Sequence, residues 1–472
     1  MSFEVKKIGE SPKQREFKFS FSRNNLFSFK EKIKKIKLKH FIILIPVLIL
    51  SFYLIISSIF KIYDYSSKNT FLKNILTPVL SELEKDENGF LNFLLIGKGG
   101  EGHDGPELTD TMIVVSIDVD KKNIIMLSIP RDLWVETQKF GASRINELSR
   151  NIKHSLETQF GIDSESASEE ATKILIKEVE KIVTLKIPYY ATIDFEGFKD
   201  IVDAFGGLEI NVEKDIYDGT YPNKNWGFEV FSIKKGTHTL DGETTLKYVR
   251  SRHGNSDFDR AERQQQVVNA LKEKAKSLGL MTSPRKIKNL FNAIRDNFKT
   301  NLDTSELITL AFLGSEIGKS SIVSTVLNND WNTRGGFLGT PPRSNYGGAS
   351  VLIPYSGIGN YSHIHVFTNL LFKHRDIQFS SFEVLNGTMN SGLATKAAQR
   401  LERYGIPVMS IGNTPKGEDY SKSEIWVYSD ESSLSKALPL INKIFPVKIV
   451  NKIGIYEESD VTATFIIGSD YK

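Results

Sequence analysis

Three observations predict a membrane-anchored α/β protein. Short apolar runs typical of buried strands alternate with longer segments of helical period across residues 88–275. A second, shorter series of strands and helices occupies residues 379–472. An uncharged apolar segment precedes both series, at residues 41–60. Because alternating strands and helices bury their apolar faces around a common sheet, we expect a larger α/β domain followed by a smaller C-terminal α/β domain.

The composition excludes several classes of function. The chain has 472 residues and a net charge of +4, from 61 basic and 57 acidic side chains. This balance gives no general signal for binding a polyanion, so we expect no nucleic acid among the partners. The chain contains no cysteine, which excludes disulfides, thiolate metal sites and thiol nucleophiles.

The N-terminal region predicts a single-pass membrane protein. Residues 41–60 are long enough to span a hydrocarbon core of ~30 Å. The basic run at residues 30–40 precedes them, so the positive-inside rule places residues 1–40 in the cytoplasm as a basic tail that contacts membrane lipids. The apolar segment is too long for a cleaved signal peptide, which favours a signal anchor. Residues 61–87 are then a juxtamembrane connector, and the bulk of the chain lies outside the cytoplasm.

Turn and strand signals divide the larger domain. Pro130 ends an apolar run and places Arg131 and Asp132 at the end of a strand, where α/β sheets collect ligand-binding residues. We predict strands at 90–96, 112–117, 123–129, 189–195 and 208–212, and helices at 145–182 (with an interruption near 163–170), 198–205 and 264–278.

The remaining sequence predicts a connector and the smaller domain. Residues 283–325 read as mostly helical and residues 328–363 as a loop rich in Gly, Asn and Pro, so residues 276–378 form a helical and loop connector. The C-terminal domain is expected to contain strands at 382–385, 408–411, 424–428 and 463–467, and helices at 394–404 and 432–444.

One polar stretch, residues 248–266, carries an unusual number of arginines. Guanidinium groups bind phosphate oxygens bidentately and stay charged at any working pH. If the first part is extended, Arg250 and Arg252 project from the same side. If Asp257 caps a helix, Arg260, Arg263 and Gln264 share one face of it. The stretch predicts either an anion clamp or a solvent-exposed, salt-bridged helix start.

Three sequence blocks together resemble a known family. They are LTDTMIVVSID, MLSIPRDLWV and LDGETTLKYVRSRHGNSDFDRAERQQQ, in this order behind a single signal anchor. Across residues 88–275 the chain resembles the LytR–CpsA–Psr (LCP) family of bacterial cell-wall enzymes. The segment from FEVLNGTMNSGLA onward resembles the LytR C-terminal domain. The resemblance implies an α/β/α domain with a central mixed sheet, anchored in the bacterial cell membrane.

The resemblance also implies an activity. Such proteins are phosphotransferases that move a glycopolymer from a polyprenyl-diphosphate carrier to peptidoglycan through a phosphodiester. The family uses Mg²⁺ and holds the polyprenyl tail in an apolar channel. The implied partners are therefore a polyprenyl-diphosphate-linked glycopolymer and a peptidoglycan acceptor. Fixed arginines and a metal ion would stabilise the charge that develops on the leaving phosphate.

Several residues match the family's functional positions. Asp110 matches the residue that binds the metal. The expected catalytic residues are those that match the pyrophosphate-holding arginines and a fourth position lining the site: Arg131, Arg250, Arg252 and Asp257. The expected substrate-binding residues are Arg144, Gln264, Arg260 and Arg263, of which the last two have an alternative role in structural ion pairs.

One stretch departs from the family pattern. Gly99 stands where the family commonly has a second aspartate, and Leu108 stands where it has a basic residue. Glu101, His103 and Asp104 on the same loop are alternatives for the second ligand. The departure favours a second hypothesis, a non-catalytic membrane-anchored scaffold or attenuator that binds wall polymer or polyprenyl phosphate. The full set of arginines favours the enzyme.

Overall fold

The computed structural model describes residues 83–100, 105–222, 227–251, 297–313, 322–415, 420–428, 432–453 and 461–471, and scattered positions between 263 and 277. The predicted cytoplasmic tail (1–40) and signal anchor (41–60) lie outside these residues. None of the helices described in these ranges is long and apolar enough to cross a membrane.

A six-stranded mixed sheet forms the centre of the larger domain, as the fold class predicted. Its order is β11-β6-β1-β2-β3-β12. Neighbours β1–β2, β2–β3 and β6–β11 are antiparallel, whereas β1–β6 and β3–β12 are parallel. The strands are β1 (Leu91–Lys98), β2 (Thr109–Asp118), β3 (Asn123–Ile129), β6 (Tyr189–Asp194), β11 (Phe298–Thr300) and β12 (Ile322–Val326).

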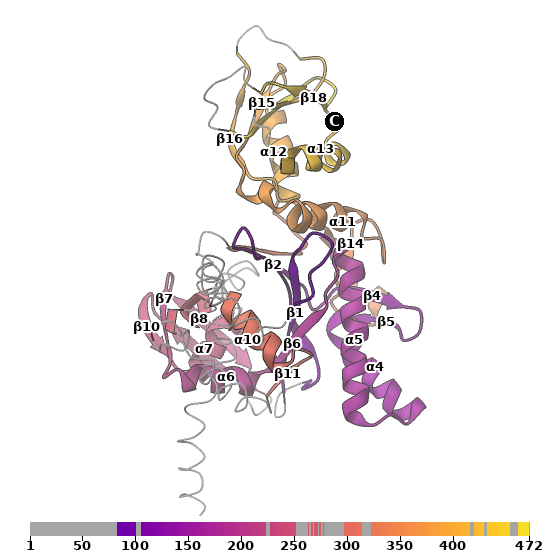
Figure 1. Cartoon of the computed structure of the whole chain (residues 1–472), viewed down its shortest axis with the longest axis vertical. Helices are drawn as coiled ribbons and strands as arrows, with labels where there is room; N and C mark the ends of the chain where they lie inside the picture. The colour runs from indigo at the N-terminus through magenta and orange to yellow at the C-terminus, as the bar shows by residue number, and fades with distance from the viewer. Residues whose placement is uncertain are drawn as a thin grey trace, which may run out of the picture.

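Both faces of this sheet are covered. Successive side chains of a strand point to opposite faces, and in β1 Leu94 and Ile96 belong to one core cluster while Leu91 and Phe93 belong to another. The first cluster includes residues of α4 (Ile145–Phe160) and α5 (Ser164–Val183), and the second includes residues of α10 (Thr304–Leu313). Figure 1 shows the α4–α5 pair on one side of the sheet. The continuous apolar character of β1 follows from this burial.

The break between α4 and α5 lies just before the predicted interruption. Gly161 has a left-handed conformation (φ 64°) that ends α4, and the Asp163 side chain accepts a hydrogen bond from the Ser166 amide at the start of α5. The Ser/Glu-rich segment that we read as an interruption is therefore the first turns of α5. Its polar residues lie mostly on the solvent side of the helix.

The region predicted to be mostly helical, 283–325, is corrected by the structure. Of its described residues only α10 is helical, whereas β11 and β12 are strands at the two edges of the central sheet. Both strands pair with partners more than one hundred residues away in sequence, which local periodicity does not reveal. The larger domain therefore continues past the boundary expected at residue 275.

A second group of elements packs beside β6 around its own core cluster. Two of its pairings, β7–β10 and β8–β9, are antiparallel, and β8, β9 and β10 were missing from the prediction. Its elements are α6 (Phe195–Ala204), β7 (Leu208–Val212), β8 (Ile216–Pro222), β9 (Phe228–Ile233), β10 (Gly236–Leu240) and α7 (Gly242–Arg250). A further antiparallel pair, β4 (Trp134–Thr137) and β5 (Gly141–Arg144), leads into α4.

The segment after β12 joins the two domains through short elements. They are β13 (Leu338–Gly339), the 3₁₀-helix η3 (Arg343–Tyr346), β14 (Ile353–Pro354), α11 (Ser362–Thr368), the π-helix η4 (Asn369–Lys373) and the 3₁₀-helix η5 (Arg375–Phe379). The backbone amide of Trp134 donates to Leu352 O at 2.8 Å, which ties the connector to the larger domain.

The C-terminal domain has a five-stranded sheet with the order β16-β15-β19-β17-β18. All six elements predicted for it are present, and β18 is additional. The elements are β15 (Phe382–Asn386), α12 (Leu393–Arg403), β16 (Val408–Asn413), β17 (Glu424–Val427), α13 (Ser432–Ile444), β18 (Lys448–Asn451) and β19 (Ala463–Ile467). In Figure 1 this domain stands at one end of the molecule, joined to the body through α11 and the residues around it.

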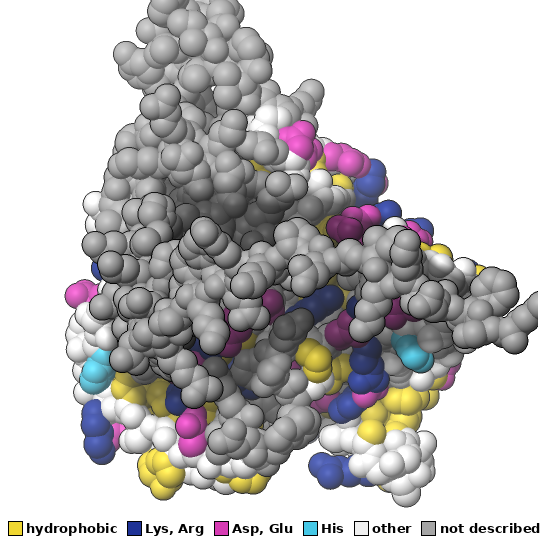
Figure 2. Space-filling model, turned by 90° about the horizontal axis from the view of Figure 1, so that it is seen from below, with side chains coloured by type: hydrophobic (Ala, Val, Ile, Leu, Met, Phe, Trp, Pro, Cys, Tyr) yellow, Lys and Arg dark blue, Asp and Glu magenta, His cyan; other side chains and the backbone are white. Residues whose placement is uncertain are grey.

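Charge is mixed over the described surface of the larger domain. On the face drawn in Figure 2, Lys and Arg side chains are interspersed with Asp and Glu. This distribution agrees with the nearly balanced composition of the chain. Any anion site on this face must therefore come from local geometry rather than from a broad electrostatic field.

Candidate active site

A cavity of about 340 Å³ opens where several elements of the larger domain end. It brings together three residues that the sequence singled out, Asp110, Arg131 and Arg250. Asp110 lies near the start of β2 and Arg131 just past the end of β3, so antiparallel pairing places both at the same end of these two neighbouring strands. Other residues lining the cavity include Phe195, Asp218, Tyr221, Asn328 and Asn329.

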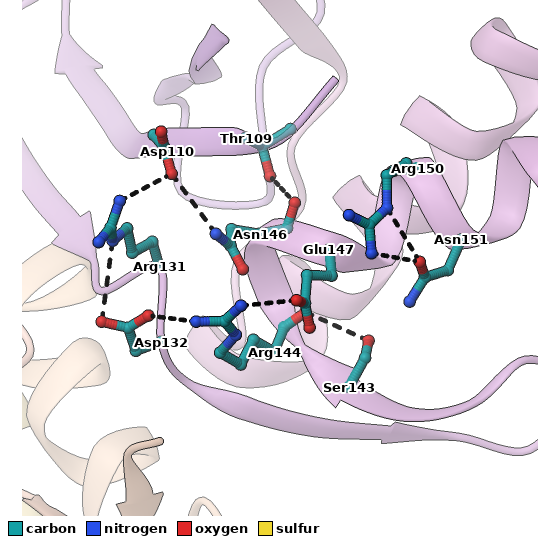
Figure 3. A network of polar contacts seen from close by, with 10 residues as sticks. All are labelled: Thr109, Asp110, Arg131, Asp132, Ser143, Arg144, Asn146, Glu147, Arg150 and Asn151. Atoms are coloured by element: carbon teal, nitrogen blue, oxygen red, sulfur yellow. Dashed lines mark hydrogen bonds and ion pairs between the residues drawn. The ribbon is translucent and has the colours of Figure 1, made fainter. Parts of the chain in front are cut away.

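The carboxylate of Asp110 is held by two neighbouring donors (Figure 3). Nη1 of Arg131 donates to its Oδ1 at 3.0 Å, and Nδ2 of Asn146 lies 3.4 Å from the same oxygen. The side chains of Arg131 and Asp110 are 33% and 23% exposed, so both remain accessible from the cavity. Within the described part of the chain, Oδ2 of Asp110 accepts no hydrogen bond.

A chain of alternating charges extends behind Arg131 (Figure 3). Nε of Arg131 is 3.8 Å from Oδ2 of Asp132, and Arg144 contacts Asp132 Oδ1 at 3.4 Å and Glu147 Oε1 at 2.6 Å. The hydrogen bond between Arg144 and Glu147 raises the pKa of Arg144 and lowers that of Glu147, so both stay charged. Arg144 does not line the cavity. Its contacts position Asp132, and its expected role in substrate binding stays a prediction.

Arg250 is the last residue of α7, a helix that begins where the Asp241 side chain accepts from the Thr244 amide. Its guanidinium carbon lies 4.1 Å from the centre of the Phe195 ring, and its Nη1 donates to the Tyr221 hydroxyl at 3.2 Å. Burial raises the pKa of Tyr221 to about 12, so this partner is a neutral phenol. Tyr248–Arg250 is helical, so the condition under which Arg250 and Arg252 would project from the same side of an extended segment is not met at Arg250.

Arg263 has a structural role in the fold. It is 5% exposed, its Nη2 donates to Ser251 O at 2.5 Å, and its guanidinium carbon is 5.9 Å from the centre of the Tyr248 ring. Ser251 in turn donates to Asp218 Oδ2 at 3.0 Å. These contacts hold the chain directly after Arg250, so the expected substrate-binding role is replaced by the structural alternative.

The other predicted site residues lie outside the described residues. They are Arg252, Asp257, Arg260, Gln264 and the alternatives for a second metal ligand, Glu101, His103 and Asp104. No motif or local pattern pointed to Asn146, Asp218, Tyr221, Asn328 or Asn329 as site residues. Arg144, which directly precedes Ile145-Asn146, was expected to bind substrate because it matches a basic position of the family.

The residues around Asp110 fit a hard cation. Mg²⁺ binds through oxygen ligands, with one or two carboxylates and oxygens of a bound phosphate. Within the described ranges, no group of three or more His, Asp or Glu side chains is arranged so that it could hold a metal ion. Asn146 is 2% exposed, and its Oδ1 has no hydrogen-bond partner among the described residues. Asp110 therefore offers one oxygen ligand, its Oδ2. Asn146 does not line the cavity and presents Nδ2 to Asp110, so its amide would have to turn to place Oδ1 beside that carboxylate.

Comparison with known proteins identifies the family. Residues 56–339 match the model of the LytR_cpsA_psr family, which is more than half of the chain. The chain belongs to the LytR–CpsA–Psr family. Residues 381–471 match a second model, described as LytR cell envelope-related transcriptional attenuator.

Curated relatives within this family include proteins with assigned names. The chain is 32% identical to the regulatory protein MsrR of Staphylococcus aureus strain Mu50, over 39% of this chain and 49% of MsrR. It is 28% identical to the polyisoprenyl-teichoic acid–peptidoglycan teichoic acid transferase TagT of Bacillus subtilis strain 168, over 49% of this chain and 66% of TagT. The chain thus spans between half and two thirds of the length of these relatives.

Solved structures of LytR–CpsA–Psr proteins are also similar. The crystal structure of B. subtilis TagV matches with a TM-score of 0.43 and 24% identity, over 59% of this chain and 96% of that chain. A structure of TagT bound to LI-WTA matches with a TM-score of 0.40 and 23% identity, over 58% of this chain and 89% of that chain.

Proposed function

We propose that this protein is an extracytoplasmic phosphotransferase, which moves a glycopolymer from a polyprenyl-diphosphate carrier to peptidoglycan. The observation that carries the proposal is the convergence of Arg131, Arg250 and Asp110 on one cavity. The relatives named as teichoic acid–peptidoglycan transferases support the same class of reaction. The apolar segment at residues 41–60 would hold the cavity near the outer face of the bacterial cell membrane.

Arg131 and Arg250 can together bind the oxygens of a diphosphate, one phosphorus of which reacts. Each guanidinium can donate two parallel hydrogen bonds to phosphate oxygens. Arg131 is fixed by Asp110 and Asp132, and Arg250 by Phe195 and Tyr221, so neither needs to reorganise when charge develops. Removing such a preorganised donor costs roughly 10²–10³-fold in rate in other enzymes.

The reaction balances without a redox partner. A hydroxyl oxygen of peptidoglycan attacks the phosphorus that carries the glycan, and the bond from this phosphorus to the bridging oxygen breaks. The polyprenyl monophosphate leaves with that oxygen, and the hydroxyl proton passes to a base or to water. The raised pKa of Tyr221 keeps it protonated, so it serves as a hydrogen-bond partner for Arg250 rather than as the base.

A Mg²⁺ ion would be held by Asp110, and a turn of the Asn146 amide, whose Nδ2 faces Asp110 Oδ1 at 3.4 Å, would bring Asn146 Oδ1 in as the second protein ligand. When bound there, the ion would neutralise charge that develops on the leaving group. Asn146 then replaces the aspartate that the family commonly carries at the position of Gly99. Its Oδ1 is buried and accepts no hydrogen bond from the described residues, so a cation would satisfy it.

The test uses the full chain in detergent with a polyprenyl-diphosphate-linked oligosaccharide and peptidoglycan fragments. We expect Mg²⁺-dependent release of polyprenyl phosphate together with a phosphodiester-linked product. Arg250→Ala should abolish both, whereas Arg150→Ala, which removes an arginine of α4 that contacts Asn151, should not. Equal turnover by Arg250→Ala and wild type would show that the proposed site is wrong.

The scaffold hypothesis remains the second candidate because Gly99 replaces a commonly acidic position. A scaffold would bind the lipid diphosphate but release no polyprenyl phosphate with any divalent cation. The same assay therefore separates the two hypotheses, since binding and turnover are measured on one sample.

A further inference from the structure

A second cavity lies between the connector and the C-terminal domain. Its volume is about 330 Å³, within the range of roughly 300–1,000 Å³ typical of small-molecule sites. The connector contributes Trp331, Asn332 and His363, and the C-terminal domain contributes the rest. The lining residues from that domain are Lys396, Gln399, Arg400, Arg403, Tyr404 and Tyr471.

The charged residues of this cavity all have the same sign. Lys396, Arg400 and Arg403 lie three or four residues apart on α12, so they share one face of the helix. The lining contains no carboxylate. None of the three forms an ion pair with an acidic side chain of the described residues. Cations near a helix C-terminus are common because they oppose its partial negative charge, but Lys396 lies in the first half of α12.

Aromatic rings form the other part of the wall. Trp331 is 46% exposed although the guanidinium carbon of Arg403 lies 3.5 Å from its ring centre and Tyr355 contacts it edge-on. An exposed tryptophan beside cations is typical of sites that bind an amphipathic ligand, because the ring covers an apolar face while the cations hold an anionic group. Sugar rings have such apolar C–H faces.

The cavity is rigidly built. Nδ1 of His363 is 2.6 Å from the Tyr404 hydroxyl, and the Gly335 amide donates to Arg403 O at 3.0 Å. Burial and the nearby Arg400 and Arg403 lower the pKa of His363, so its ring is neutral at pH 7. The loop that carries Trp331 is closely packed at Gly336, where a Cβ would lie 1.9 Å from Asp330 O. These contacts fix the aromatic and basic walls relative to each other.

The same loop lines both cavities. Asn328 and Asn329 line the candidate active site, and Trp331 and Asn332 line the second cavity. Asn329 and Trp331 are two residues apart, so their Cα atoms are separated by at most about 7 Å. The walls of the two cavities therefore share one short loop.

We propose that this second cavity binds a phosphate-bearing segment of the glycan chain whose diphosphate end occupies the active site. The identity of the ligand rests on the proposed function, whereas its chemical class, an anionic saccharide or polyol phosphate, follows from Lys396, Arg400 and the exposed Trp331. The C-terminal domain then favours charged polymers over neutral ones, and it holds the glycan so that its diphosphate end stays in the active site.

The experiment measures binding of a synthetic glycerol-phosphate hexamer to the full chain by calorimetry and tryptophan fluorescence. The Lys396→Ala/Arg400→Ala variant should bind about tenfold more weakly and show a smaller salt dependence, because it lacks two charge-assisted contacts. Its matched control is Lys436→Ala/Lys443→Ala, which removes the same charge from α13 and should bind as wild type does. Fluorescence quenching by the hexamer should disappear in Trp331→Phe but persist in Trp426→Phe.

Three outcomes would overturn the proposal. The first is equal binding of the hexamer by Lys396→Ala/Arg400→Ala and wild type, and the second is equal binding of the neutral chitohexaose and the hexamer by wild type. The third is full competition by inorganic phosphate at equal concentration, because the cavity would then be a simple anion site. Turnover of the lipid-linked donor is assayed separately on wild type. If turnover is absent but the hexamer binds through Lys396 and Arg400, the proposed function fails and the anionic-glycan site stands.

Discussion

Nη1 of Arg131 donates to Oδ1 of Asp110 at 3.0 Å, at the end of the neighbouring strands β2 and β3 (Figure 3). The pair joins the two kinds of group that diphosphate chemistry requires, a fixed cation and a carboxylate for a metal. Because the contact uses only one carboxylate oxygen, Asp110 can hold Arg131 in place and still offer Oδ2 to a cation.

Asp110→Asn tests this double role. The amide oxygen can still accept from Arg131, but the negative charge that attracts Mg²⁺ is lost. We expect turnover to fall by roughly 10²-fold or more and the Mg²⁺ needed for half-maximal activity to rise. Thermal unfolding gives a second readout, since Mg²⁺ with substrate diphosphate should stabilise wild type but not the variant. An unchanged Mg²⁺ response would place the metal elsewhere.

Asn146→Ala tests the second ligand separately. Thr109 contacts the backbone oxygen of Asn146, so this contact survives the substitution. We expect Mg²⁺ to bind less tightly, so that half-maximal activity needs more Mg²⁺, while the Arg131–Asp110 pair stays intact. Asn151→Ala, one turn further along α4, is the matched control and should leave the Mg²⁺ titration unchanged. If both variants titrate as wild type does, Asn146 is not a ligand.

Arg250→Lys separates charge from geometry. Lysine keeps the positive charge but cannot form a bidentate contact with phosphate or stack in the same way on Phe195. We expect kcat for polymer transfer to fall by roughly tenfold or more, with a smaller change in KM, because the contact strengthens in the transition state. Full activity of this variant would show that Arg250 acts only as a point charge.

Asp200 predicts a pH dependence of stability. Burial, with Glu196 and Asp203 adding to it, raises the pKa of Asp200 to about 6. The folded protein therefore binds more protons than the unfolded chain between pH ~4 and 6. The contribution of Asp200 to stability is present below pH ~4 and is lost as the pH rises through about 6. Asp200→Asn, which can still accept from Asn297 Nδ2, should raise the Tm at pH 7.5 by a few degrees.

The measurement is thermal unfolding of wild type and Asp200→Asn at pH 4 and pH 7.5. The two proteins should differ at pH 7.5 and converge at pH 4. Asp215→Asn is a useful contrast, because hydrogen bonds from Lys234 and Lys235 lower the pKa of this exposed carboxyl. A Tm difference between wild type and Asp200→Asn that stays constant with pH would contradict the raised pKa.

Arg375 links the connector to the larger domain. It is 2% exposed, its nitrogens donate to Ser116 Oγ at 2.6 Å and Asn123 Oδ1 at 3.0 Å, and its guanidinium carbon lies 3.7 Å from the Phe90 ring centre. Arg375→Leu would leave both oxygens without their donor. We expect a loss of roughly 2–3 kcal/mol in the free energy of unfolding, measured by urea denaturation.

The control for Arg375→Leu is Lys373→Ala in the same segment. Lys373 pairs with Glu87 at 2.8 Å, but the Glu87 side chain is 76% exposed, so the pair should contribute less than about 1 kcal/mol. Similar losses in the two variants would show that the buried contacts of Arg375 do not govern the docking of the connector.

The sequence indicated several elements of the active site without the structure. Asp110, Arg131 and Arg250 meet at one cavity, and each lies at the end of a strand or helix that is clear from the local apolar pattern. The charge of Arg144 and Arg263 was equally clear, but their roles were not. Whether an arginine faces a cavity or supports its wall depends on partners such as Glu147 and Ser251, which lie on other elements or turns.

By itself the sequence determined the α/β class, the order of most elements, the C-terminal domain and the family. These follow from local periodicity, turn residues and motif spacing, which neighbouring residues specify. Only the tertiary structure decided that β11 and β12 complete the central sheet, that Tyr221 supports Arg250, and that the loop of Asn329 and Trp331 lines two cavities. These features depend on contacts between distant segments, where the stabilising interactions come from packing and pairing and leave no local pattern.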